Sequence, residues 1–341
     1  MGIESSLGQR LEAGQRLAVV DCGSNTFSLL VAEVVSDAQG QWGWKKIQHH
    51  PRYVHLGRGS FRSGILNRDR MRRGWDVLGM FVEAMRNTGV SSLACLATSA
   101  VRDAKNKAEF LRGAADLGCP IQVIDGLTEA ALVQRGVRQT VEAAGSDWSD
   151  CTLASLDIGG GSVEMSLWTG DTVHYSGSLN IGLSRLTDWI KPKDWWSPKD
   201  LESAAAIIDD EMKPFLKAAA AHAPRAWVGS SGTIKALQQL LTPDELPGYE
   251  VADLLPSAEL FPLLDRLIPM HQNALRKLPN LHPDRVPYIA LGSTVVRHAL
   301  RATGTDQLFC SRFAMAEGLL SACTSSKLAP TSGLPTFSSF V

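Results

Sequence analysis

The sequence predicts an α/β protein built in two related halves, on three observations. A strand–turn–strand pattern with an aspartate and glycines at its turn occurs around Asp21 and again, 136 positions later, around Asp157. Short apolar runs alternate with segments of helical periodicity along both halves. At 341 residues, 44% of them hydrophobic, the chain is long enough to build two cores.

The first half, residues 1–144, is expected to form one domain that continues from the Asp21 hairpin into alternating elements. Apolar residues at helical spacing follow residue 70, and the Asp125-Gly126 pair favours a turn that leads into another helix. The elements expected in order are a helix over 68–88, a strand over 91–97, a helix over 107–117, a strand over 121–124 and a helix beginning near Thr128.

The second half, residues 145–324, is expected to form the second domain, with a disordered tail at 325–341 rich in Ser, Pro, Thr and Gly. Ser197 followed by Pro198 and Asp200 is typical of a helix start. The elements expected are the Asp157 hairpin, a strand and turn leading into a helix over 176–189, a helix after Ser197, a strand over 226–229, a helix opening at 230–233 and helices to about 322.

The two hairpin turns suggest phosphate chemistry. Glycine lets backbone N–H groups converge on an anion without side-chain interference. An aspartate that ends the preceding strand can hold a divalent cation directly or through water. Two such loops facing each other would form a phosphate clamp, so we expect the site in a cleft between the halves.

Charge is balanced overall but not locally. The net charge is −1, yet nine Lys and Arg residues lie between positions 45 and 73 with Asp69 as the only acid. This segment is either a solvated surface compensated elsewhere or a positive strip that steers a long anionic substrate. The candidates for steering are Arg52, Arg58 and Arg62.

Other features predict a cytoplasmic protein. No stretch is apolar enough to span a membrane, and the N-terminus lacks the basic start and apolar core of a secretory signal. The six cysteines form no close pairs and no metal-ligand spacing, which is typical of buried, reduced thiols. Neither a membrane nor a nucleic acid is expected as a partner.

Six motifs occur in fixed order and together resemble the exopolyphosphatase / guanosine pentaphosphate phosphohydrolase (Ppx/GppA) family, from about residue 17 to residue 320. The resemblance implies two ribonuclease-H-like domains of the actin-like ATPase superfamily that close over phosphates, in the short two-domain form. The motifs are Asp21-x-Gly-Ser-Asn25, Ala97-Thr-Ser-Ala-x-Arg-x-Ala-x-Asn106, Gly126-x-x-Glu-Ala130, Asp157-Ile-Gly-Gly-Gly-Ser-x-Glu164, Ile181-Gly182 and Gly229-Ser-Ser-Gly-Thr233.

The resemblance implies a catalytic group of two residues. Glu129 would be the base that activates water, although a helix N-terminal acid that complements the dipole is the plain alternative. Arg102 would grip phosphate oxygens, with a salt bridge inside its own domain as the alternative.

The resemblance also implies a metal site for Mg²⁺ or Mn²⁺ at Asp157, Glu164 and Asp21. The alternative for Glu164 is a solvent-facing strand position. The residues expected to bind phosphate are Gly23, Ser24, Asn25, Ser99, Gly159, Gly160, Gly161, Ser162, Gly232 and Thr233, of which the last two are equally consistent with a plain helix cap.

The function expected is Mg²⁺-dependent removal of the terminal phosphate from inorganic polyphosphate. Hydrolysis of guanosine pentaphosphate is the alternative substrate, and a non-catalytic sensor that binds guanosine tetraphosphate or polyphosphate is the alternative class. A kinase or ATPase of the same superfamily would leave Glu129 unexplained. Homodimerisation is common in the family. The chain departs from the family pattern at Thr128, Ala131, Pro287 and Ala316, which bears on substrate preference and rate.

Overall fold

The structure is a computed structural model that describes residues 2–4, 10–145, 148, 150–192, 195–243, 251–324 and 334–340. The chain divides into two compact units, Met1–Gly136 with Met315–Val341, and Val137–Ala314. This division differs from the expected boundary at 144/145. The boundary lies inside helix α5 (Gly126–Ala144), and α12 (Met315–Thr324) packs on the sheet of the first unit.

The first unit is built on a mixed sheet with strand order β14-β6-β3-β4-β5, and β7 pairs with β6. Strands β3, β4 and β5 form an antiparallel meander, while β6 runs parallel to β3 and β7 runs parallel to β6. A separate two-stranded sheet joins β1 (Gly2–Glu4) and β2 (Arg10–Glu12). The main strands are β3 (Arg16–Cys22), β4 (Thr26–Ser36), β5 (Trp42–Tyr53), β6 (Ser92–Ala97), β7 (Ile121–Val123) and β14 (Ser338–Ser339).

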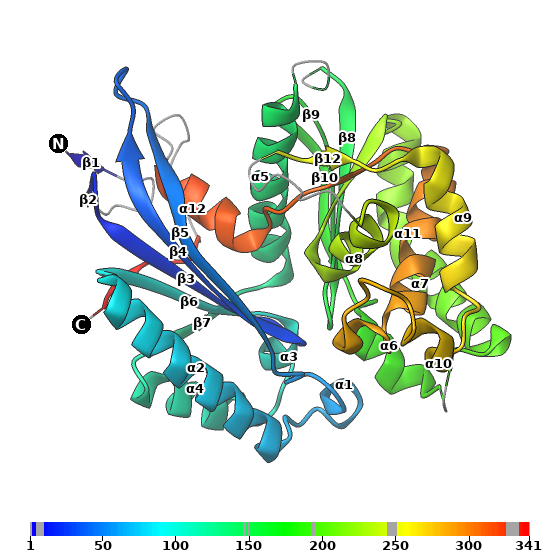
Figure 1. Ribbon diagram of the computed structural model, residues 1–341, viewed down its shortest axis with the longest axis horizontal. Helices are drawn as coiled ribbons and strands as arrows, with labels where there is room; N and C mark the ends of the chain where they lie inside the picture. Colours follow the sequence, from blue (N-terminus) through cyan, green and yellow to red (C-terminus); the bar gives the residue numbers. More distant parts are fainter. Residues whose placement is uncertain are drawn as a thin grey trace. The chain divides into compact units, whose positions relative to one another are not determined.

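Helices cover both faces of this sheet. Helices α2 (Arg68–Thr88) and α4 (Lys107–Asp116) lie side by side on one face and bury a common apolar core there (Figure 1). Helix α12 contacts β3 and β5, where the Trp44 indole donates to Ser321 Oγ at 3.4 Å. Two short helices, α1 (Ser60–Ser63) and α3 (Ser99–Arg102), follow strands β5 and β6.

The second unit is built on a sheet of order β10-β9-β8-β11-β13-β12. Its strands are β8 (Thr152–Ile158), β9 (Val163–Thr169), β10 (Thr172–Leu179), β11 (Ala226–Ser230), β12 (Asp253–Leu254) and β13 (Leu308–Cys310). The helical elements are α6 (Leu183–Ile190), α7 (Pro198–Ala221), α8 (Ser231–Leu241), α9 (Ser257–Leu267), α10 (Gln272–Leu275), the 3₁₀ turn Pro283–Arg285 and α11 (Ile289–Thr303). One large apolar core joins this sheet to α7, α8, α9 and α11.

The two sheets repeat one topology. Strands β8, β9 and β10 form an antiparallel meander, β11 runs parallel to β8, and β13 runs parallel to β11. In the first unit β3, β4 and β5 form the meander, and β6 and β7 take the places of β11 and β13. Strands β3 and β8 even begin and end at positions 136 residues apart. The duplicated meander with two added parallel strands is the pair of ribonuclease-H-like domains that was expected.

The C-terminal tail departs in part from the sequence-based expectation of disorder. Residues 325–333 lie outside the described residues, but Ser338 and Ser339 form β14 against β6. Phe337 is buried, and Phe340 packs against the core beneath α2. A segment with few apolar residues can therefore still be ordered, because its two phenylalanines reach a core made elsewhere in the chain.

Five of the six cysteines are buried and none forms a disulfide, as expected for reduced thiols. Burial raises the pKa of the Cys310 thiol to about 11, which keeps it protonated and unreactive at neutral pH. Among the described residues, no helix combines the length and apolar character that a membrane crossing requires.

Candidate active site

The two glycine turns have the same geometry. The Gly23 N–H donates to the Thr26 carbonyl at 3.2 Å, and the Gly159 N–H donates to the Ser162 carbonyl at 3.1 Å. A Cβ atom at either glycine would come within 2.9 Å of that carbonyl oxygen. Glycine is therefore required at both positions by close approach, and the repeat seen in the sequence is a repeat in three dimensions.

The turn of the second unit directs its carbonyl groups toward helix α6. The Leu183 and Ser184 N–H groups donate to the Gly159 and Gly160 carbonyls at 3.1 and 2.7 Å. The Arg185 guanidinium, which is buried, donates from Nε to the Gly161 carbonyl at 2.6 Å. No described residue accepts a hydrogen bond from the Gly160 or Gly161 N–H groups. These donors suit phosphate oxygens.

Sequence reasoning missed Arg185. It lies three residues after Gly182, inside an ordinary amphipathic helix, and a buried arginine there has no local signature. Its partner is a backbone carbonyl 24 residues earlier in the chain, which only the tertiary structure brings near.

Gly182 allows α6 to approach this turn so closely. Its Cβ would lie 2.3 Å from both the Gly161 carbonyl carbon and the Ser162 nitrogen, so Gly182→Ala must move backbone. We expect Gly182→Ala to lower the free energy of unfolding by about 1–3 kcal/mol, measured by urea denaturation. We also expect it to abolish phosphate release from polyphosphate. The matched control is Gly79→Ala in α2, where a Cβ meets nothing within 4 Å. That control is expected to be neutral or stabilising, and equal losses in both variants would contradict the close-packing argument.

A row of carboxylate and hydroxyl side chains, whose oxygens could bind a metal, crosses the second sheet next to this turn. Asp157 pairs in register with Glu164 on β9 and with Ser230 on β11, and Glu164 pairs with Ser178 on β10. The four side chains therefore share one face of the sheet. Glu164 is only 3% exposed, and the Ser178 hydroxyl donates to its Oε1 at 2.7 Å. This burial is at odds with a solvent-facing role for Glu164.

This donor row fits Mg²⁺. The Ser230 hydroxyl is fully buried and has no hydrogen-bond partner among the described residues. Two carboxylates on neighbouring strands repel unless a cation or a proton lies between them. No group of three or more His, Cys, Asp or Glu side chains with metal-binding geometry occurs in the described parts of the chain. Mg²⁺ characteristically uses one or two carboxylates, water and substrate phosphates, so Asp157 and Glu164 suffice.

The hairpin of the first unit has only one of the two carboxylates found in the hairpin of the second unit. Asp21 pairs in register with Ser28, which stands 136 positions before Glu164. A hydroxyl therefore replaces the second carboxylate of the row. Asp21 alone offers a charged metal ligand in this unit's turn, which is consistent with the minor metal role expected for it.

The structure brings Glu129 and Arg102 together within the first unit. Arg102 Nη1 lies 3.2 Å from Glu129 Oε2 and also donates to the Ile124 carbonyl at 3.0 Å. The Glu129 side chain is 11% exposed and the Arg102 side chain is 22% exposed. The ion pair holds the Glu129 carboxylate in one orientation. Arg102 Nη2 makes no hydrogen bond with a described residue, so it can still serve an anion.

Glu129 lies in the first turn of α5, which begins at Gly126, two residues before the expected start near Thr128. Asp125 precedes the helix, and its Oδ1 accepts from the Thr128 N–H at 2.7 Å. This hydrogen bond lowers the pKa of the Asp125 carboxyl. A depressed pKa in the folded state means that the stabilisation is present above the unfolded pKa and is lost as pH falls through the folded one.

Asp125→Ala is therefore expected to lower the free energy of unfolding by about 1 kcal/mol at neutral pH. The loss should shrink as pH falls below about 4, the ordinary pKa of an aspartate. Urea denaturation between pH 3 and pH 7 measures it. A loss that does not change with pH would show that the carboxylate does not cap α5.

The turn of the first unit is held by two other segments. The Ser24 and Ser99 hydroxyls lie 3.0 Å apart, which joins the turn to the start of α3. The Gly57 N–H donates to the Ser24 carbonyl at 2.8 Å, and both Val54 and His55 donate to the Asn25 carbonyl. Arg58 therefore follows directly after a residue that contacts the turn, and Arg62 lies one helical turn further along.

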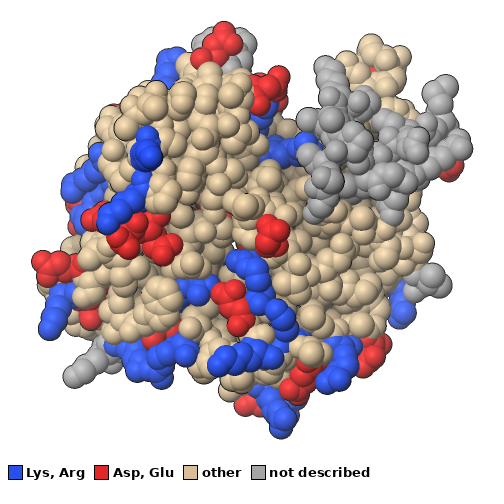
Figure 2. Space-filling view, turned by 180° about the vertical axis from the view of Figure 1, so that it is seen from behind, with Lys and Arg blue, Asp and Glu red and all other residues tan. Residues whose placement is uncertain are grey.

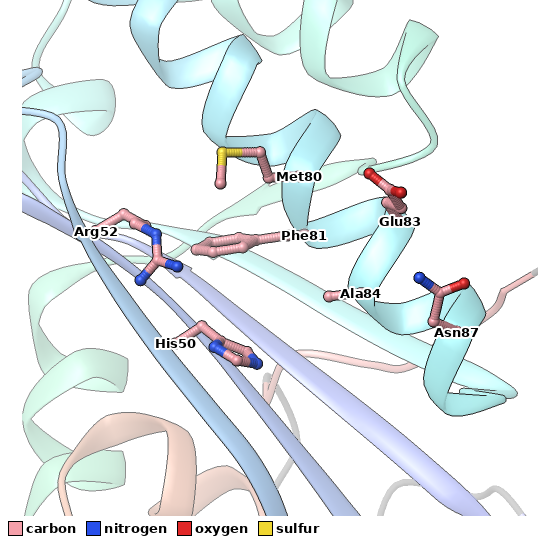
Figure 3. A pocket seen from close by; sticks show the side chains of 7 residues that line it. All are labelled: His50, Arg52, Met80, Phe81, Glu83, Ala84 and Asn87. Carbon is pink, nitrogen blue, oxygen red and sulfur yellow. The ribbon is translucent and has the colours of Figure 1, made fainter.

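Arg52 lies on the other face of the sheet. It is in register with Phe27 and Cys22, whereas Asp21 is in register with Ser28 and Pro51. Successive residues of a strand point to opposite faces, so Arg52 points away from the Asp21 face. It lines a pocket of 260 Å³ between β5 and α2, where it approaches the Phe81 ring beside His50 (Figure 3). Arg52 is thus directed away from the face that carries Asp21.

The basic segment is partly compensated. Arg72 pairs with Asp69 at 2.6 Å, and Arg68 lies 3.7 Å from Glu109. On the face shown in Figure 2, Lys and Arg side chains are interspersed with Asp and Glu. Two of the nine cations of residues 45–73 thus have an acidic partner, and steering by this segment stays a prediction.

The Gly229–Thr233 motif opens α8 as expected, with Ser231 at a φ of 71°. A Cβ at Gly232 would lie 1.8 Å from the Arg285 guanidinium, so this arginine packs directly on the first turn of the helix. The N–H groups at a helix N-terminus favour an anion, and Arg285 adds positive charge beside them, so this end of α8 suits phosphate. The Thr233 side chain instead packs against Gly292 of α11.

Comparison with known proteins agrees with this geometry. Residues 33–326 match the Ppx/GppA phosphatase family. The chain belongs to this family. Membership identifies it as a phosphoanhydride hydrolase. The chain is 29% identical over 319 residues to "Exopolyphosphatase 2" of Mycobacterium tuberculosis, an alignment that covers 89% of this chain and 97% of the relative.

Two solved structures share this fold. An exopolyphosphatase from Cytophaga hutchinsonii superposes with a TM-score of 0.82 at 26% identity, over 90% of this chain and 96% of the other. The Ppx/GppA enzyme of Aquifex aeolicus superposes with a TM-score of 0.71 at 24% identity, over 90% and 98% of the two chains, and supports the fold alone.

Proposed function

We propose that this Ppx/GppA family member is an exopolyphosphatase that hydrolyses the terminal phosphoanhydride of inorganic polyphosphate. The observation that carries the proposal is the buried Glu129 carboxylate, held by Arg102 at the first turn of α5. A carboxylate held in one position is what a water-activating base requires. The names of the relatives in Mycobacterium tuberculosis and Cytophaga hutchinsonii support polyphosphate as the substrate.

In this mechanism Glu129 orients the attacking water in line with the terminal phosphorus and takes its proton. Within the first unit, Arg102 Nη2 would hold phosphate oxygens while charge develops on them. Within the second unit, the N–H groups of Gly160 and Gly161 are the corresponding donors. The leaving group is itself a phosphate of low basicity, so no separate acid is needed.

Asp157 and Glu164 would hold Mg²⁺ or Mn²⁺, with Ser230 and Ser178 as neighbouring oxygen donors. The cation would supply charge neutralisation at the phosphate oxygens. Arg58 and Arg62, which follow Gly57 at its contact with the turn of the first unit, would attract the next phosphates of the polymer. Guanosine pentaphosphate, the alternative substrate, shares only the terminal anhydride with polyphosphate.

The test is phosphate release with Mg²⁺ from long-chain polyphosphate and from guanosine pentaphosphate, at equal concentrations of phosphoanhydride. We expect faster release from polyphosphate. Preferential release from guanosine pentaphosphate would change the substrate but keep the hydrolase. No release from either, with polyphosphate still bound, would replace the proposal by a sensor.

A further inference from the structure

The C-terminal strap, residues 334–340, adds a strand to the sheet of the first unit. Ser338 and Ser339 pair antiparallel with Leu93 and Ser92 at the start of β6. The Phe340 N–H extends the pairing by donating to the Ser91 carbonyl at 2.9 Å. Figure 1 shows this C-terminal segment alongside β6.

A side chain of β7 holds the strap a second time. The Gln122 Nε2 donates to the Thr336 carbonyl at 2.6 Å, and the Thr336 N–H donates to Gln122 Oε1 at 3.1 Å. A carboxamide offers one donor group and one acceptor group, so it satisfies the backbone of Thr336 as a neighbouring strand would. The strap is thus joined to β6 by backbone pairing and to β7 by Gln122.

Apolar contacts make the docking specific to this segment. Pro335 is buried, and Phe337 is 4% exposed. Phe340 packs against the core that β6 shares with α2. Backbone pairing supplies affinity in strand addition, while pockets for particular side chains supply specificity. The edge of β6 and β7 is therefore a binding groove for an extended segment with phenylalanines three residues apart.

The two strands that the strap joins lead to the proposed catalytic pair. Strand β6 runs through Thr98 into α3 (Ser99–Arg102). Strand β7 has three residues, and β6 is the only strand that pairs with it among the described residues. It continues into Ile124, whose carbonyl accepts from Arg102, and then into the start of α5 with Glu129.

We propose that the C-terminal strap positions Glu129 and Arg102 by fixing β7 against β6. A three-residue edge strand has few backbone hydrogen bonds of its own, so the two bonds from Gln122 restrain it substantially. Gln122 is a positioning residue that is proposed to touch neither the substrate nor the attacking water. The inference rests on the proposed function for its effect on catalysis, whereas the docking of the strap can be measured without any activity.

The first experiment compares Gln122→Ala and Gln122→Glu with the wild type in the full chain. Hydrogen exchange should show lost protection at the Thr336 and Phe340 amides in Gln122→Ala, and an intermediate result in Gln122→Glu, which keeps an acceptor for the Thr336 N–H. In polyphosphate hydrolysis, kcat should fall by about tenfold or more with KM unchanged. Ser339→Ala, whose side chain is exposed, is the matched control and should match the wild type.

The second experiment supplies the strap as a separate molecule. Thr336→Pro removes the N–H that Gln122 accepts and should release the strap. A fluorescent peptide of residues 334–340 should then bind the Thr336→Pro chain and restore kcat, but should not bind the wild type, whose groove is filled. Equal binding to both chains, or no binding to either, would overturn the docking.

The outcomes separate the two proposals. Lost protection at Thr336 with unchanged kcat would overturn positioning while leaving the proposed hydrolase intact. If the wild type released no phosphate from polyphosphate, the proposed function would fail, and exchange and peptide binding would still decide whether the groove exists. Unchanged exchange in Gln122→Ala would overturn the strap itself.

Discussion

Glu129→Gln is expected to reduce phosphate release from polyphosphate by about 10²–10⁴-fold, the usual contribution of a positioned general base. Glutamine keeps the shape of the side chain and its place in the first turn of α5, but it cannot accept the proton of the attacking water. Arg102 keeps its hydrogen bond to the Ile124 carbonyl, so the guanidinium should stay in place. Binding of polyphosphate, measured by anisotropy of a labelled chain, is therefore expected to persist.

The matched control is Glu142→Gln on the same helix, where an exposed carboxylate pairs with Arg138 at 2.6 Å. It should leave both release and binding unchanged. If Glu129 serves only as the partner of Arg102, then Glu129→Gln would lower the free energy of unfolding and weaken binding along with turnover. Full activity in Glu129→Gln would rule out the mechanism.

Asp157→Asn is expected to lower turnover by about 10³-fold, because a bound metal supplies several kcal/mol of charge stabilisation at the phosphate oxygens. The same change should also be visible without substrate. Mg²⁺ that binds only the folded protein raises Tm, so the wild type should show a Mg²⁺-dependent rise and the variant should not.

In the absence of metal, Asp157→Asn removes one of two neighbouring carboxylates and should not destabilise the second unit. The control is Asp210→Asn, an exposed carboxylate paired with Lys213 on α7, which should retain the Mg²⁺ response. A Mg²⁺-dependent rise in Tm that survives in Asp157→Asn would place the metal elsewhere. Chelation that leaves polyphosphate hydrolysis intact would contradict a metal role altogether.

The duplicated hairpin was the part of the fold most open to prediction. Its turn is local, since the glycine N–H and the carbonyl three residues on belong to one short stretch of chain, at Gly23 and again at Gly159. The amphipathic helix over Arg68–Thr88 has the predicted bounds for the same reason, with Asn67 as its cap. The unit boundary and the docking of residues 334–340 depend on contacts between distant segments, so periodicity could not reveal them.

Some residues of the candidate site could likewise be predicted from nearby sequence, whereas others could not. Asp157 and Glu164 could be proposed together because one hairpin carries both. Ser230 joins them from a strand 73 residues further along the chain, and Arg185 reaches the Gly161 carbonyl from α6. Arg52 was grouped with Arg58 and Arg62 by proximity in sequence, but the alternation of β5 turns it to the opposite face of its sheet from Asp21.

The sequence by itself determined the two-fold repeat, the two glycine turns and the chemical types of the residues that close them, because these depend on backbone freedom and on spacing within a few residues. Only the tertiary structure decided that Arg102 pairs with Glu129. It also decided that Ser178 and Ser230 lie beside the carboxylates of Asp157 and Glu164, and that Gln122 hydrogen-bonds to the strap. Each of these arrangements brings together groups from separate strands or helices. Strand order and register determine which groups become neighbours, and register is a property of the packed sheet rather than of any one segment.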